Sequence, residues 1–177
     1  QTLPEITSRI LMEITPVLKS FKPNIVLVHG DTATTFAATL AAYYEQIEVG
    51  HVEAGLRTGN IYSPWPEEGN RKLTSAIADL HFAPTETSKE NLLQENIDPE
   101  KIIVTGNTVI DALLAVIKIL DTNVELKSSL QAKFHFLDKN KRLVLITGHR
   151  RESFGGGFER ICEAIVHTAK EFPEVEF

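Results

Sequence analysis

Short apolar runs alternate with longer amphipathic stretches along most of this chain. The short runs are rich in β-branched residues and end at polar residues or glycine, as buried strands do, whereas the longer stretches repeat apolar residues at helical spacing. The pattern predicts strands over 24–29, 49–52, 81–83, 102–105 and 143–146, with a last strand beginning at 175. It predicts helices over 3–17, 34–46, 67–80, 85–95, 108–120 and 158–172.

This alternation predicts an α/β fold, with Rossmann-like parallel sheets and helices on both faces. Pro16 is expected to kink or end the first helix, because proline has no amide hydrogen to donate. Apolar residues cover more than one side of helix 108–120, so this helix is expected to be buried on several sides. The polar segment 121–141 is expected to be a connector that contains a short helix.

Composition excludes several classes of function. The formal charge is -6, and the basic residues are scattered apart from Arg150 and Arg151, so a broad nucleic-acid surface is not expected. No run reaches the roughly 18 apolar residues of a membrane span. Cys162 is the single cysteine, which favours a reducing compartment, and its apolar neighbours predict a place in the core. The absence of an initiator Met and the strand beginning near the last residue indicate an internal piece of a longer protein.

Polar residues follow three of the predicted strands, at the strand ends where open parallel sheets bind ligands. Asp31 follows the strand 24–29, Glu53 follows 49–52, and His149 follows 143–146. A fourth polar cluster, Glu67 and Glu68, opens the helix after Pro66. We expect these positions to converge on one crevice.

Most of these residues also have a purely structural interpretation. The pair Asp31–Thr32 could cap the next helix. Glu67 and Glu68 suit a helix N-terminus, where the helix dipole favours anions, and Glu67 could pair with Arg71 one turn later. Glu53 is harder to explain in this way, because a charge directly after an apolar strand is costly unless it is used or exposed.

The region around His149 is typical of a phosphate site. Arginine beside a glycine-rich turn that precedes a helix can hold phosphate, and here Arg150 lies near the glycines at 155–157. That turn matches neither a Walker loop nor a dinucleotide fingerprint, so it could equally be a flexible lead-in. His29, His51 and His149 lack the paired spacing of metal ligands, and no metal is expected.

Taken in order, five segments resemble the bacterial non-hydrolysing UDP-N-acetylglucosamine 2-epimerases: HGDT, HVEAGLRTGNIYSPWPEEGNR, APTETSKENL, VTGNTVIDALL and ITGHRRESFG. The resemblance covers almost the whole chain. It implies a two-domain fold of the glycosyltransferase-B type, also called UDP-glycosyltransferase/glycogen phosphorylase-like. On this basis, residues 1–120 are the latter part of the N-terminal domain, 121–141 are a connector, and 142–177 begin the C-terminal UDP-binding domain.

The resemblance also implies an activity, that of an isomerase interconverting UDP-N-acetylglucosamine and UDP-N-acetylmannosamine. UDP would leave to give a 2-acetamidoglucal and then add back with C2 inverted, supplying units for cell-surface polysaccharides. The implied catalytic residues are Asp31, Glu53, Glu67 and His149. The implied substrate-binding residues are Arg71 and Arg150, together with Asp31, Glu53 and His149. A cytoplasmic homodimer without a metal or nicotinamide cofactor is implied, and the carboxylate that takes the C2 proton stays open.

Three other functions remain as alternatives. A hydrolysing epimerase would release N-acetylmannosamine and free UDP. A glycosyltransferase of the same fold would need an acceptor, and a sugar-nucleotide sensor would bind without turnover.

Overall fold

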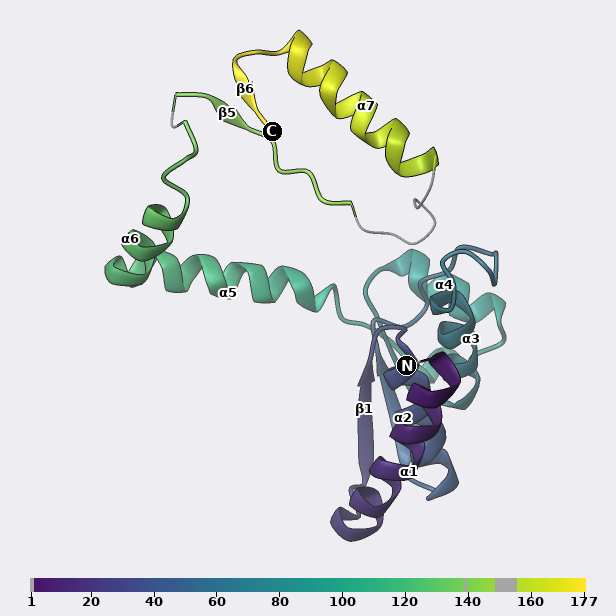
Figure 1. Ribbon diagram of the computed structural model, residues 1–177. Coiled ribbons are helices and arrows are strands. Elements are labelled where there is room, and N and C mark those ends of the chain that lie inside the picture. Colours follow the sequence, from purple (N-terminus) through teal and green to yellow (C-terminus); the bar gives the residue numbers. More distant parts are fainter. Residues whose placement is uncertain (1, 139, 149–155) are drawn as a thin grey trace. The chain divides into compact units, whose positions relative to one another are not determined.

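The computed structural model describes residues 2–138, 140–148 and 156–177 (Figure 1), and the chain divides into two compact units, Gln1–Asp111 and Ala112–Phe177. The elements of the first unit are α1 (Leu3–Phe21), β1 (Ile25–His29), α2 (Ala33–Tyr44), β2 (Glu48–Val52), α3 (Glu67–Ile77), β3 (Leu80–Ala83), α4 (Glu86–Gln94), the short helix η1 (Pro99–Lys101) and β4 (Ile102–Val104). Helix α5 (Thr108–Thr122) runs from the first unit into the second. Among the described residues, no helix has the length and apolarity needed to cross a membrane.

The four strands of the first unit form one parallel sheet in the order β1-β2-β3-β4. The register pairs His29 at the end of β1 with Val52 at the end of β2. Residues that directly follow these two strands therefore meet at the same edge of the sheet. The predicted parallel α/β architecture is confirmed.

Helices α1, α2 and α4 pack on one face of this sheet. Val28 and Val49 form a core with Leu18 of α1 and three alanines of α2, and Leu92 of α4 packs on Ile102. Side chains on the opposite face include Leu27, which is 63% exposed. The prediction of helices on both faces is therefore met for one face only within the described residues of this unit.

Helix α1 continues through Pro16 and ends at Phe21, so the prediction that this proline ends the helix is wrong, whereas the kink that was the other expectation stays a prediction. The carbonyl that loses its partner belongs to Met12, which is 76% exposed. Water can replace the missing hydrogen bond at such a position, and this lowers the penalty for proline. The C-terminal cap is the left-handed Lys22, whose amide donates to the Leu18 carbonyl.

The second unit contains α6 (Val124–Lys133), β5 (Arg142–Leu143), α7 (Gly156–Glu171) and β6 (Val175–Glu176), in which β5 and β6 are parallel. Helix α6 is the short helix expected between 121 and 141, whereas the role of that segment as a domain connector stays a prediction.

Two expectations of burial are wrong for the described chain. Helix α5 has no buried residue, and Cys162 is exposed beside an apolar hollow that Phe158 and Ile165 also line.

Two histidines lie side by side in the interior of the first unit. His51 of β2 and His81 of β3 are register partners, and both are fully buried. Neither ring nitrogen of His81 has a hydrogen-bond partner within the described part of the chain. Burial, together with the nearby charge of His51, lowers the pKa of His81 from 6.5 to about 4. His81 is therefore neutral in the folded protein at neutral pH.

We expect His81 to make the protein sensitive to acid. His81 binds a proton near pH 6.5 in the unfolded state but only near pH 4 in the folded state. Its protonation therefore does not affect the free energy of unfolding above pH 6.5, and lowers it as the pH falls from 6.5 towards 4. Below both pKa values, the loss in the free energy of unfolding caused by this shift is about 3 kcal/mol. His81→Leu should show a smaller fall in melting temperature than the wild type between about pH 7 and pH 4.5. His167→Leu, at an exposed position in α7, is the matched control, and an equal fall in both variants would contradict the assignment.

Candidate active site

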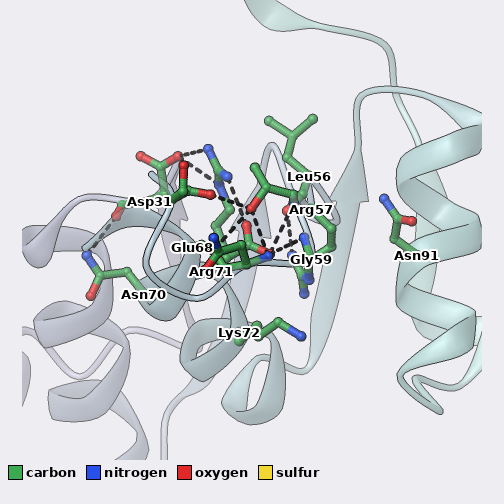
Figure 2. A network of polar contacts seen from close by, with 12 residues as sticks. Asp31, Leu56, Arg57, Gly59, Glu68, Asn70, Arg71, Lys72 and Asn91 are labelled. Atoms are coloured by element: carbon green, nitrogen blue, oxygen red, sulfur yellow. Dashed lines mark hydrogen bonds and ion pairs between the residues drawn. The ribbon is translucent and has the colours of Figure 1, made fainter. Parts of the chain in front are cut away.

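Asp31 is the second residue after β1, and its side chain points toward α3 (Figure 2). The cap of α2 is Thr32, whose hydroxyl accepts from the Thr35 amide at 3.3 Å. The Asp31 carboxylate is thus not used as a cap. Its Oδ2 atom accepts from Arg71 through both Nε, at 2.9 Å, and Nη2. Asn70 also holds this residue, because its amide nitrogen donates to the Asp31 carbonyl at 2.8 Å.

Glu53 directly follows β2 and has a left-handed backbone with φ 67. This conformation costs a residue with a side chain about 1–2 kcal/mol. One carboxylate oxygen lies 3.9 Å from His29 Nε2, and a Cβ added to Gly30 would be 3.5 Å from the same oxygen. The strained backbone therefore turns this carboxylate toward the neighbouring strand end, one residue before Asp31.

The loop after Glu53 is held by close packing and by buried polar contacts. A Cβ on Gly55 would lie 2.1 Å from the Ser88 carbonyl oxygen, so only glycine fits there. Asn91 of α4 donates to the Gly55 carbonyl at 2.9 Å. Arg57 forms two hydrogen bonds with the Glu95 carboxylate, of 2.9 and 2.7 Å, which lower the pKa of Glu95. The loop is consequently fixed to α4 at three points.

The first turn of α3 supplies the remaining carboxylates. Glu67 is half-buried, whereas Glu68 is completely buried. The suggested pairing of Glu67 with Arg71 is wrong, because Arg71 Nη1 donates to Glu68 at 3.1 Å instead. The two ion pairs of Arg71 are with Asp31 and Glu68, and the Glu67 carboxylate takes part in neither.

Four of the predicted site residues, Asp31, Glu53, Glu67 and Arg71, thus belong to elements that meet at the carboxyl edge of one sheet. His149 and Arg150 lie outside the described residues. Among the residues that the structure does describe, no group of three His, Cys, Asp or Glu side chains could hold a metal ion. The catalytic roles of Asp31, Glu53 and Glu67 and the substrate-binding role of Arg71 stay predictions.

Two polar residues that contact this site were given no catalytic or binding role from the sequence, although Glu68 was part of the polar cluster expected at the crevice. Asn70 donates to the Asp31 carbonyl, and Glu68 accepts a hydrogen bond from Arg71. The spacing of Glu68 three residues before Arg71 was an available signal for the pairing. Nothing in the sequence indicated that Asn70 would bond to a residue 39 positions away.

Comparison with known proteins gives consistent matches over the whole chain. Residues 1–177 match the family model described as UDP-N-acetylglucosamine 2-epimerase. The UDP-N-acetylglucosamine 2-epimerase of Yersinia pestis is 58% identical over 99% of the chain and 47% of its own length. The chain spans about half the length of the curated relatives it matches.

Solved structures show the same similarity. The crystal structure of the Neisseria meningitidis UDP-GlcNAc 2-epimerase bound to UDP-GlcNAc matches with a TM-score of 0.96 and 54% identity, covering 100% of this chain and 47% of that one. The Methanocaldococcus jannaschii UDP-GlcNAc 2-epimerase, in complex with UDP-GlcNAc and UDP, matches with a TM-score of 0.84 and 39% identity. The match covers 98% of this chain and 46% of that one.

The left-handed backbone at Glu53 leads to a prediction about stability. Glu53→Gly removes the strain of about 1–2 kcal/mol, which offsets the entropic cost of glycine, so the melting temperature should stay the same or rise. Glu48→Gly, in the preceding strand β2 and without a positive φ, should lose about 0.5–1 kcal/mol. Thermal denaturation of both variants tests this, and a larger loss at Glu53 than at Glu48 would contradict it.

Proposed function

Because this chain belongs to the UDP-N-acetylglucosamine 2-epimerase family, we propose that the whole protein interconverts UDP-N-acetylglucosamine and UDP-N-acetylmannosamine. The observation that carries this proposal is the meeting of Asp31 and Glu53 at one sheet edge, with α3 fixed against them through Arg71. The likeness to a structure bound to UDP-GlcNAc supports the same substrate.

The proposed reaction requires proton transfer at C2 of the sugar. A carboxylate takes the C2 proton, the bond between C1 and the diphosphate oxygen breaks, and UDP leaves with that electron pair to give the 2-acetamidoglucal. UDP then adds back to C1, and a proton is delivered to C2 from the opposite face. Several carboxylates near one crevice can supply both a base and an acid.

The described residues suit these steps in different ways. Glu53 and Glu67 are half-buried, and neither carboxylate forms an ion pair with Arg71. Asp31 is fixed by Arg71 and Asn70, which suits a group that must keep one orientation during proton transfer. The guanidinium of Arg71 is engaged by two carboxylates, so a positioning role is better supported than direct contact with the substrate.

The remaining parts of the proposal rest on the family alone. His149 and Arg150 would hold the diphosphate and assist its departure. Residues 1–120 and 142–177 would belong to the N-terminal and C-terminal domains, joined by 121–141. The whole enzyme would be a cytoplasmic homodimer that supplies N-acetylmannosamine units for cell-surface polysaccharides.

The proposal is tested by incubating the whole protein with UDP-N-acetylglucosamine alone in deuterated water. We expect UDP-N-acetylmannosamine to form with deuterium at C2, as observed by NMR, without steady loss of UDP. Accumulation of free UDP and N-acetylmannosamine would instead identify a hydrolysing epimerase. Binding without deuterium at C2 would identify a protein that senses the sugar nucleotide.

Replacing single carboxylates by amides separates a chemical role from a structural one. Glu53→Gln and Glu67→Gln should each lower turnover about 100- to 10,000-fold, because an amide cannot exchange protons as a carboxylate does. Their melting temperatures should stay close to the wild-type value. Asp31→Asn should lower turnover similarly and also reduce stability, since Arg71 then loses a charged partner at a site where it is 13% exposed.

The matched control is Glu86→Gln, an exposed glutamate in the first turn of α4, which should leave both quantities unchanged. Loss of folding as large as the loss of rate in Glu53→Gln or Glu67→Gln would support a structural role for those residues.

A further inference from the structure

Glu68 is a completely buried carboxylate in the first turn of α3. A buried charge is costly unless it is paired and hydrogen-bonded. Both of its oxygens have partners: Oε1 accepts from the amides of Thr58 and Gly59, at 3.1 and 3.3 Å, and Oε2 accepts from Arg71 Nη1 at 3.1 Å. Because no part of Glu68 is exposed, this residue cannot touch a substrate.

The contact with Arg71 continues to Asp31. Arg71 uses Nε and Nη2 for the Asp31 carboxylate and Nη1 for Glu68, so its planar guanidinium is held from two sides (Figure 2). A guanidinium that is bound on one side alone can still pivot about that contact. The bond to Glu68 removes this freedom and thereby fixes the orientation of the Asp31 carboxylate.

The contacts with Thr58 and Gly59 fix a second part of the site. These two residues lie in the loop that begins at Glu53 and ends at α3. Their amides point to the same Glu68 oxygen, which ties the loop to the first turn of the helix that carries Glu67. Glu68 therefore connects the segments bearing all three proposed catalytic carboxylates.

We propose that Glu68 is a positioning residue that sets the geometry of Asp31 through Arg71, and of the loop between Glu53 and Glu67 through the amides of residues 58 and 59. This inference rests on the proposed epimerase function. A misplacement of about 1 Å in a reacting group can lower a rate about 100-fold. The effect should appear in kcat rather than KM, because Glu68 makes no contact with the substrate.

The test uses Glu68→Gln in the whole protein. The amide keeps the volume and one acceptor oxygen, but it cannot accept from both the loop amides and Arg71. We expect kcat to fall about 100-fold with KM nearly unchanged. Glu45→Gln is the matched control, because its carboxylate also pairs with a cation, Lys19, but lies outside both the Asp31 contacts and the loop between Glu53 and α3. It should leave kcat unchanged.

A double-mutant cycle distinguishes positioning from general destabilisation. If Glu68 acts through Asp31, Glu68→Gln should lower the rate much less in an Asp31→Asn background than in the wild type. Equal, additive losses of kcat in the two backgrounds, or a kcat that stays at the wild-type value while the melting temperature falls, would overturn the proposal.

A measurement without turnover separates this proposal from the proposed function. Rotation of the Arg71 guanidinium about its Nε–Cζ bond, followed by nitrogen NMR, should be slow in the wild type and in Glu45→Gln but fast in Glu68→Gln. A wild type that leaves UDP-N-acetylglucosamine unchanged would refute the epimerase function, and the rotation rate would still decide the role of Glu68. Slow rotation in Glu68→Gln would overturn that role.

Discussion

The ion pairs of Arg71 connect the parts of the proposed active site. This guanidinium lies between Asp31, at the end of β1, and Glu68, in the first turn of α3. Without it, two carboxylates would lie in a largely buried region without a compensating charge, at a substantial electrostatic cost. The same contacts fix α3 against the strand ends, so one electrostatic requirement also determines where Glu67 lies.

The parallel register of β1 and β2 provides the second constraint. It places Asp31 and Glu53 at the same edge, and the left-handed backbone of Glu53 turns its carboxylate toward Gly30. A strained residue persists only where the surrounding structure determines its conformation. Here Gly55, packed directly on the Ser88 carbonyl, and the Arg57–Glu95 pair fix the loop that follows. The backbone of Glu53 thus costs local stability, and it gives the Glu53 carboxylate a specific orientation toward Gly30.

Different physical properties made parts of the fold easier or harder to predict. The strands and helices of the first unit follow from apolar periodicity. The expected end of the helix at Pro16 was wrong because solvent exposure reduces the penalty for proline, and exposure is not a local property of the sequence. Burial of α5 and Cys162 was wrong for a related reason, since apolarity indicates a tendency to be covered but does not supply the covering element.

The sequence by itself determined the order of strands and helices, the parallel α/β class, and the placing of Asp31 and Glu53 after successive strands. These features depend on local spacing and on the rule that parallel strands end at a common edge. Only the tertiary structure decided that Thr32, not Asp31, caps α2 and that Glu68, not Glu67, pairs with Arg71. Neighbouring residues of similar chemistry satisfy the same sequence pattern, and the fold decides between them. Asp31 is bound by Arg71, 40 residues away, and Glu68 rather than Glu67 is completely buried beside the same arginine.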